Sequence, residues 1–454
     1  MKDRSAVIWT RLGAQPVKMG MLVITDKEAR FTYEAGYSET GLPGLSLVYP
    51  PDQFNSTIVR PRSEFFDLHP PLQSLVLARE ERNFLRALLL KYLSKINVTP
   101  EPGFDTDWQL LMIAGHGGIG HLDVFESDSV ANEWYSTPSK KGLIELDDKF
   151  GFSLKEFMTW YDGDSEEIIS VIGPTPAVGG AIPKLPLSIE QSGWDGRVGL
   201  PTRFGDTGRT DILLKLENTA QYPGIIELEA LGLTIHDEAG FDVPRFWPVT
   251  VKNLNALAIE RFDRTKNGST VYMESMYSIL AAGNIKVNDH HSATYDFIGQ
   301  AIDSTKVQLV SDRKEAKKHL LDRLILAMLT GNGDLHLNNL SIIEKEGQLA
   351  FSPVYDPVPM RAYKIHDELY PSEMGFGNYG EDVNGEMIGF KTAYLRFSKN
   401  LGISKTTLLN SVEHMLQVTD NYNKRIDDLD TLPKENKELL IKVHKNIREK
   451  FERL

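Results

Sequence analysis

The chain has no cysteine, no apolar run long enough to cross a bilayer, and fewer positive than negative charges. Without cysteine it forms no disulfide and offers no thiolate nucleophile or thiolate metal ligand. Without eighteen consecutive apolar residues, no transmembrane helix is expected. A formal net charge of −13 disfavours nonspecific binding to nucleic acid, which depends mainly on neutralising phosphates with Lys and Arg. The G-x-x-x-x-G-K-[ST] and G-x-S-x-G signatures are also absent, which disfavours P-loop NTPases and α/β-hydrolases.

What is present is an ordinary globular composition in a long chain. The 454 residues are 41% hydrophobic and 25% charged, which predicts two or three domains with cores of their own. The first residues lead into a strand-like run and not into a signal-peptide core. Together with the lack of cysteine, this start predicts a cytoplasmic protein.

The first part of the chain alternates between strand and helix patterns. Strand-like runs occupy residues 6–9, 20–24 and 29–33, and helical spacing extends from Leu75 to Leu93. A glycine-rich segment, residues 115–121, follows a helix and precedes the strand 122–125. Phosphate-binding loops run in the opposite order, from strand to helix N-terminus, so a plain connecting turn is expected here. Its two histidines, at positions 116 and 121, have no carboxylate beside them at metal-ligand spacing.

The middle and the end of the chain are expected to be mixed and then helical. Residues 126–165 are polar and irregular in pattern, and a strand is predicted at 211–216 and a helix at 224–240. A further strand at 256–262 leads through a hairpin turn, residues 266–269, to a strand at 270–273. Asp312 is the expected N-cap of a long helix, and Pro433 opens the last of two or three helices in the tail.

The most informative stretch runs from Leu329 to Asp356. Asp334 and Asn339 lie five residues apart in a glycine-flanked polar loop, and Asp356 follows seventeen residues later, after two short strands. Phosphoryl transfer to a hydroxyl needs an aspartate to accept the proton, and an amide and a second aspartate to hold magnesium. The spacing of Asp334 and Asn339 is that of a protein-kinase catalytic loop. His336 is expected to brace this loop and is counted with its catalytic residues.

Upstream residues supply the other parts of such a site in the expected order. The glycine-containing loop from Val178 to Lys184 is suited to cover phosphates with its N–H groups. Lys215 lies in an apolar strand; it is either an edge lysine pointing to solvent or the lysine that grips phosphates, positioned by Glu227 or Glu229. The strand end from Glu260 to Phe262 is predicted to pair with adenine. His290 and His291 are expected on a loop surface.

These residues resemble the HipA family of bacterial serine/threonine kinase toxins. The similarity covers residues 173–400, and the first 125 residues resemble the family's N-terminal subdomain. The matching segments are Gly179-Gly180-Ala181-Ile182-Pro183-Lys184, Ile212 to Lys215, Glu229 with Ala239 to Pro244, Ile259 to Arg264, Gly331 to Asn339, and Ser352 to Asp356.

The resemblance implies an α+β, two-lobed protein-kinase fold with a β-rich N-terminal subdomain (1–125), a linker (126–170), an N-lobe (171–263) and a helical C-lobe (264–454). It implies ATP and Mg²⁺ as cofactors, with Asp334 as catalytic base and Asn339 and Asp356 as metal ligands. It also favours Glu229 over Glu227. The residues implied in nucleotide binding are Val178, Gly179, Gly180, Ala181, Lys184, Lys215, Glu229, Glu260, Arg261 and Phe262.

The family further implies partners and a target. These are a HipB-like helix-turn-helix antitoxin, DNA reached only through that antitoxin, and an aminoacyl-tRNA synthetase as the protein substrate, whose phosphorylation halts translation and growth. Three positions depart from the family's pattern. Ala177 stands where an autophosphorylated serine is usual, with Thr175 nearby, and Ile182 and Leu335 replace more polar residues.

Two other functions fit the same residues. One is a small-molecule kinase on a related scaffold, for which the acids at 367, 368, 373, 381 and 382 are candidates. The other is a non-catalytic protein that binds an antitoxin and acts as a co-repressor. The joint presence of Lys215, Asp334, Asn339 and Asp356 favours catalysis over the second alternative.

Overall fold

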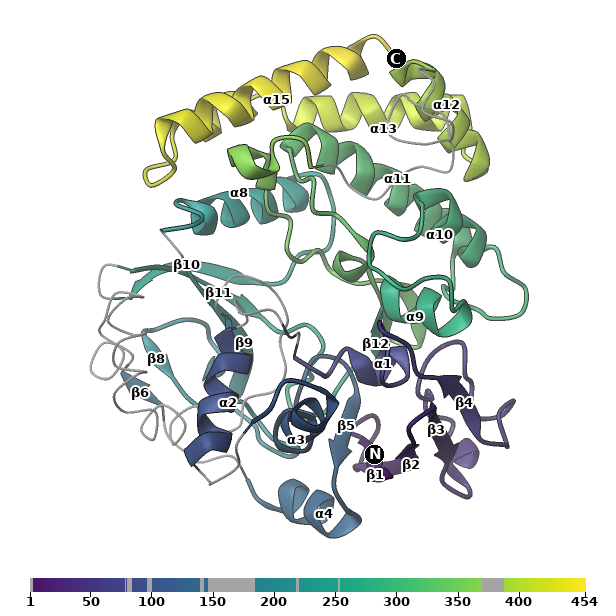
Figure 1. The fold of residues 1–454 in the computed structure, drawn as a ribbon. Helices are drawn as coiled ribbons and strands as arrows, with labels where there is room; N and C mark the ends of the chain where they lie inside the picture. Colours follow the sequence, from purple (N-terminus) through teal and green to yellow (C-terminus); the bar gives the residue numbers. More distant parts are fainter. Residues whose placement is uncertain are drawn as a thin grey trace. The chain divides into compact units, whose positions relative to one another are not determined.

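The computed structural model describes residues 3–77, 79, 84–95, 100–138, 143–145, 184–217, 220–251, 254–369 and 388–454. The chain divides into two compact units, drawn together in Figure 1. The first comprises Met1–Asn218 and Arg245–Glu274, and the second comprises Thr219–Pro244 and Ser275–Leu454. The sheets are antiparallel and occur together with helices, which is the expected α+β class.

The first unit begins with an antiparallel five-stranded sheet in the order β4-β3-β2-β1-β5. The predicted strands are confirmed and somewhat longer than expected. Alternate residues of β3, such as Ala29 and Phe31, are buried, as the period of two along a strand requires. The strands are β1 (Arg4–Thr10), β2 (Val17–Ile24), β3 (Glu28–Tyr33), β4 (Ile58–Pro61) and β5 (Leu122–Phe125). The short helix η1 (Tyr37–Thr40) follows β3, and α1 (Pro70–Gln73) follows β4.

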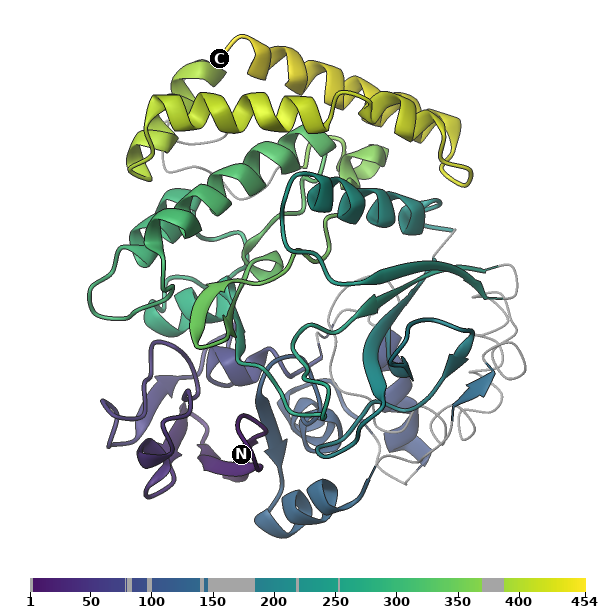
Figure 2. The same ribbon diagram turned by 180° about the vertical axis from the view of Figure 1, so that it is seen from behind.

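A second sheet in the same unit has the order β10-β11-β9-β7. Its strands are β7 (Lys184–Glu190), β9 (Arg209–Leu216), β10 (Phe246–Val251) and β11 (Leu254–Glu260), and β6 (Ile144–Glu145) pairs with β8 (Arg197–Val198) beside it. Helices α2 (Phe84–Lys95) and α3 (Phe104–Ala114) cover one face of this sheet (Figure 2). Helix α3 also packs on the N-terminal sheet through Trp108 and Leu111, so it joins the two cores.

Three segments differ from the sequence-based expectation. Helical spacing was expected from Leu75, but residues 74–77 are not helical, and helix α2 is described from Phe84. The stretch 126–165 was expected to be irregular, yet it contains α4 (Asp128–Ser136), because Ser127 caps it by accepting from the Val130 N–H and Ala131 packs against a small aromatic cluster. The expected strand 270–273 is reduced to a single bridge at Thr270, and β12 (Met273–Ser275) begins only at its end.

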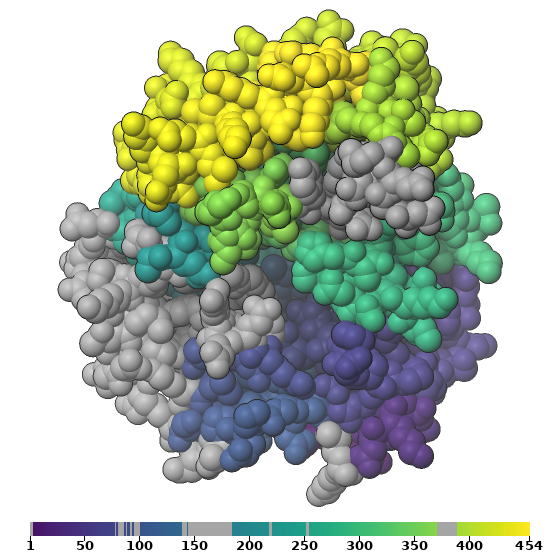
Figure 3. Space-filling model, turned by 45° about the horizontal axis from the view of Figure 1, so that its top comes forward, coloured from purple at the N-terminus to yellow at the C-terminus, as the bar shows by residue number. Residues whose placement is uncertain are grey.

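The second unit is mainly helical. Its elements are α8 (Ile225–Glu238), α9 (Met276–Gly283), α10 (Tyr295–Ile302), α11 (Arg313–Thr330), η2 (Leu337–Asn339), β13 (Ser341–Lys345), β14 (Gln348–Phe351), η3 (Met360–Ala362), η4 (Lys364–His366), α12 (Phe390–Asn400), α13 (Lys405–Val418), α14 (Tyr422–Asp427) and α15 (Lys434–Glu452). The outer side of α15, yellow in Figure 3, carries exposed charges such as Lys434 and Glu449. No helix of the described segments has the length and apolar character needed to cross a membrane.

Helix α11 forms the core of this unit and leads into the candidate site. Asp312 caps it as predicted, by accepting from the Glu315 N–H, and every residue from Leu320 to Thr330 is buried. The helix ends at Gly331, whose φ of 75° is left-handed and therefore favours glycine. A Cβ at this position would lie 2.7 Å from a methyl group of Leu440 in α15, whose side chain would have to shift. The chain then turns directly into the polar loop.

Candidate active site

The loop from Asn332 to Asn339 is held together by bonds to the backbone of Asp334. The Asp334 N–H donates to Asn332 Oδ1 at 3.1 Å, and Asn339 Nδ2 donates to the Asp334 C=O at 2.7 Å. Asn332 and Asn339 are both buried, whereas the Asp334 side chain is 42% exposed. The loop thus fixes the backbone of Asp334 and leaves its carboxylate at the surface, where a general base has to be.

The donor set fits a hard divalent cation. Nδ2 of Asn339 donates to the Asp334 C=O, so Oδ1 is the atom of this side chain that could coordinate a metal ion. Asp356 supplies a carboxylate after the β13–β14 hairpin, and it adopts a left-handed φ of 50°, which is unusual for a residue other than glycine. Amide and carboxylate oxygens are ligands that Mg²⁺ accepts, with water and phosphate completing its shell.

His336 lies in this loop as a neutral brace. Its Nδ1 accepts from the Asn338 N–H at 3.2 Å, which assigns the proton to Nε2, 3.8 Å from Asp334 Oδ1. Burial, together with the neighbouring His290 and His291, lowers the pKa of His336 to about 3. His290 and His291, which were expected on a loop surface, also pack against this loop. The centre of the His290 ring lies 4.3 Å from that of the His336 ring. Within the described residues, no three acids or histidines have metal-binding geometry.

In the first unit, two lysines lie directly opposite each other on the second sheet. Lys215 of β9 pairs with Lys184 of β7, and both are buried. Strand β9 has neighbours on both sides and Lys215 is only 2% exposed, so the interpretation of Lys215 as an edge lysine is wrong. Because opposite residues of an antiparallel pair point to the same face of the sheet, the two lysine side chains lie on one face. Residues 175–183, with Ala177 and the implied phosphate loop Val178 to Ala181, lie outside the described residues.

Helix α8 of the second unit places the two candidate glutamates differently. Glu227 accepts from the backbone N–H groups of Asp430 and Thr431, at 3.3 and 2.8 Å, and so ties the helix to the tail. Glu229 is completely buried. A carboxylate in such surroundings is stabilised by a cationic partner. This placement agrees with the choice of Glu229 from the family pattern, and its pairing with Lys215 stays a prediction.

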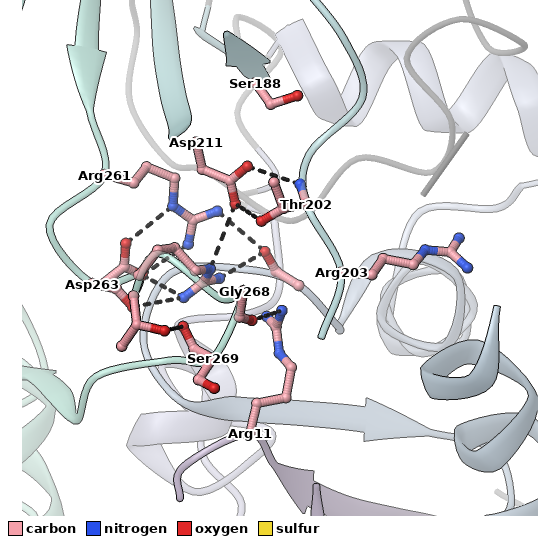
Figure 4. Close-up of polar contacts among 12 residues, drawn as sticks. Arg11, Ser188, Thr202, Arg203, Asp211, Arg261, Asp263, Gly268 and Ser269 are labelled. Atoms are coloured by element: carbon pink, nitrogen blue, oxygen red, sulfur yellow. Dashed lines mark hydrogen bonds and ion pairs between the residues drawn. The ribbon is translucent and has the colours of Figure 1, made fainter. Parts of the chain in front are cut away.

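The implied adenine-binding segment, Glu260 to Phe262, ends β11 in the first unit. The Glu260 N–H donates to the Arg245 C=O at 2.9 Å, and the Arg261 N–H donates to the Asp211 C=O at 2.8 Å. Arg261 therefore cannot give its N–H to a base without breaking this bond. Its side chain points into a buried network (Figure 4) and donates to Gly118 O and Asp263 at 2.7 and 2.8 Å. Adenine binding by this segment stays a prediction.

This buried network was not anticipated from the sequence. Arg261 and Arg264 share Asp263, whose pKa stays below its usual range because the two guanidinium groups outweigh the effect of burial. Burial and the charge of Arg261 lower the pKa of Arg264 to about 9. The glycine-rich turn, expected to be a plain connection, offers Gly117 and Gly118 carbonyls to both arginines and the Gly120 N–H to Asp263. The alternation of Arg and Asp at 261–264 was the only local signal for it.

Comparisons with known proteins agree with this architecture. A family model described as the HipA-like C-terminal domain matches residues 176–422, more than half of the chain. A Haemophilus influenzae protein named "Putative kinase" is 25% identical over 307 residues, covering 62% of this chain and 82% of that protein. "Putative kinase Y4dM" of Sinorhizobium fredii is 31% identical over 150 residues, covering 30% of this chain and 34% of that protein.

Among solved structures, the fold matches HipA of Shewanella oneidensis, determined with HipB and its operator DNA. The TM-score is 0.62 at 16% identity, and the match covers 96% of this chain and 95% of that chain. At this identity the match shows the fold alone. Taken with the family model, which spans the loop from Asn332 to Asn339, it confirms the expected resemblance. The chain therefore belongs to the HipA-like kinase family.

Proposed function

We propose that this protein is a serine/threonine protein kinase that uses ATP and Mg²⁺ to phosphorylate a hydroxyl of a cellular protein and thereby inhibits growth. The observation that carries the proposal is the loop in which Asn332 and Asn339 hold the backbone of Asp334 while its carboxylate stays accessible. A loop that only connected α11 to β13 would not need two buried amides on one aspartate. Membership of a kinase family supports the same chemistry.

In the proposed reaction, the oxygen of the substrate hydroxyl attacks the γ-phosphorus of ATP while Asp334 accepts the hydroxyl proton. The bond between the γ-phosphorus and the β,γ-bridging oxygen breaks, and ADP leaves. His336, neutral and with its N–H on the side of Asp334, helps to orient the carboxylate without competing for the proton. Asn339 and Asp356 would hold Mg²⁺, which when bound neutralises charge that develops on the phosphates.

Nucleotide binding is assigned to the residues of the family pattern. Lys215 and Lys184, two buried lysines on one face of the sheet, are the proposed phosphate-binding cations, and Glu229 is the proposed partner of Lys215. Because the N–H groups of Glu260 and Arg261 are already donated, an adenine contact by these two residues would use their carbonyl groups. Residues Val178 to Ala181 are proposed as the phosphate loop on the family pattern alone.

Partner and target follow the family. The Shewanella protein was solved with HipB and operator DNA, and a HipB-like antitoxin is proposed for this chain too, with DNA reached through it. An aminoacyl-tRNA synthetase is the proposed target. No described feature favours a small-molecule kinase: Asp367, one of its candidate acids, is paired with Lys364, and residues 373, 381 and 382 lie outside the described residues.

The test is transfer of γ-phosphate from labelled ATP to proteins of a cell extract, followed by phosphoamino-acid analysis. Wild type should give labelled phosphoserine or phosphothreonine, and Asp334→Asn should reduce the rate at least about 10³-fold, as expected for loss of a catalytic base held in an organised site. Asp303→Asn, an exposed carboxylate of the same unit paired with Lys317, is the matched control and should leave the rate unchanged. Equal labelling by wild type and Asp334→Asn would refute the proposal.

A further inference from the structure

Tyr355, the residue before Asp356, contacts both sides of Asn339. Its hydroxyl donates to the Asn338 C=O at 2.6 Å and lies 2.6 Å from Ser341 Oγ. Asn338 precedes Asn339, and Ser341 follows it by two residues at the start of β13. The Tyr355 side chain thus bridges the residues on either side of Asn339, which is one candidate metal ligand. Tyr355 also directly precedes Asp356, the other candidate ligand.

The direction of these hydrogen bonds follows from the donors available. A tyrosine phenol keeps its proton near neutral pH. A phenol has only one proton to donate, and a carbonyl can only accept. The Tyr355 hydroxyl therefore donates to Asn338 C=O, and the Ser341 hydroxyl donates to Tyr355. Hydrogen bonds linked in this way strengthen one another inside a protein.

The backbone at Asp356 shows why such a clamp is needed. Its left-handed φ of 50° is costly for a residue with a Cβ and persists only where the surroundings hold it. The Val354 N–H donates to the Asp242 C=O at 2.8 Å, and this bond holds the backbone directly before Tyr355. Val354 and the Tyr355 hydroxyl together fix the chain immediately before the strained residue.

We infer that Tyr355 is a positioning residue that sets Asn339 and Asp356 at the separation at which both bind the same Mg²⁺ of a nucleotide complex. This inference rests on the proposed function. Asn339 is tied to the backbone of Asp334 by its own side chain, so a shift of residues 338–339 also reaches the catalytic base. Loss of the Tyr355 hydroxyl should therefore weaken metal-dependent binding first and the chemical step second.

The test is calorimetric binding of the non-transferable analogue β,γ-imido-ATP to the full chain, with Mg²⁺ and with EDTA. In Tyr355→Phe, the gain in affinity on adding Mg²⁺ should be about 10-fold smaller than in wild type, the size expected when two hydrogen bonds are lost. The affinity in EDTA should stay within about twofold. Ser341→Ala removes only one of these bonds, and its Mg²⁺-dependent gain should be reduced about threefold.

The matched control is Tyr422→Phe, which deletes a buried hydroxyl that donates to the Thr330 C=O at 2.8 Å in the same unit. It should bind the analogue as wild type does. If Tyr355→Phe and Ser341→Ala both show the full Mg²⁺-dependent gain, the positioning role is overturned and the proposed function stands. If wild type itself gains no affinity from Mg²⁺, the proposed function fails, and this inference fails with it. Thermal melting of each variant shows that binding is compared between folded proteins.

Discussion

The carboxylate of Asp263 is buried in a charged network of the first unit, whereas that of Asp334 is exposed on a loop of the second unit. Side chains of Arg261, Asp263 and Arg264 are at most 5% exposed, and each ion pair is closed by glycine carbonyls or N–H groups. The Asp334 side chain is 42% exposed, and Asn332 and Asn339 hold this residue through its backbone N–H and C=O.

This difference in exposure separates the structural role of Asp263 from the catalytic role that we propose for Asp334. Buried charges are tolerated only when they are paired and hydrogen-bonded, so the Asp263 carboxylate serves to stabilise the fold. In the loop, hydrogen bonds of Asn332, Asn339 and Tyr355 hold the backbone, and the Asp334 side chain stays 42% exposed. The contrast yields predictions in which activity and stability respond separately.

The largest effect is expected for Asp356→Asn. It should lower phosphoryl transfer at least about 10³-fold, or about 4 kcal/mol, because an amide cannot replace the charge that a carboxylate brings to Mg²⁺. Its free energy of unfolding should stay within about 0.5 kcal/mol of wild type, since Asn tolerates a left-handed φ such as the 50° found here. Rates of label transfer and urea denaturation measure the two quantities. A stability loss as large as the activity loss would remove the contrast.

The next effect belongs to the network. Asp263→Ala should destabilise the protein by about 3–5 kcal/mol, because it leaves the buried guanidinium groups of Arg261 and Arg264 without the carboxylate they share. Urea denaturation followed by circular dichroism gives the value. Asp263→Asn, which keeps the volume and part of the hydrogen bonding, should lose less. A loss below about 1 kcal/mol in Asp263→Ala would show that the network is not a source of stability.

The sequence predicted the loop better than the network, for a physical reason. The helix cap at Asp312 and the polar loop that carries Asp334 and Asn339 are local patterns, and the structure has the cap and the loop where they were expected. Arg261 reaches Gly117 across 144 residues, a contact that no local period encodes. The segment that includes Arg261 was therefore interpreted only as an adenine-binding strand end.

Other differences have equally specific causes. Helix α4 escaped prediction because its polar residues resemble a linker, although the Ser127 cap and the burial of Ala131 stabilise it. The role of Tyr355 depends on a hydroxyl that crosses from the chain after β14 to the loop before β13, which spacing alone does not reveal. Contacts between distant segments are thus where the sequence is least informative.

A smaller effect concerns His336, which lies in the loop but behaves like a buried group. Because its folded pKa of about 3 lies below the ordinary value near 6.5, the unfolded chain binds the extra proton below pH 6.5. The stability contributed by His336 is fully present above that pH and is lost as the pH falls towards 3. Between pH 6.5 and 5.5, His336→Gln should lose about 1 kcal/mol less stability than wild type. Urea denaturation at the two pH values measures this, and parallel losses would contradict the assignment.

The smallest effect is expected at the exposed ion pair between Lys345 and Asp242, whose side chains are 65% and 64% exposed. Lys345→Ala should change the free energy of unfolding by less than about 0.5 kcal/mol, because solvent and salt screen such pairs. Phosphoryl transfer should be unchanged, since the interaction lies outside the loop and is not buried like that of Asp263. Urea denaturation in low and high salt checks the first point, and the rate of label transfer checks the second. A loss near that of Asp263→Ala would mean that burial does not decide which charges stabilise this protein.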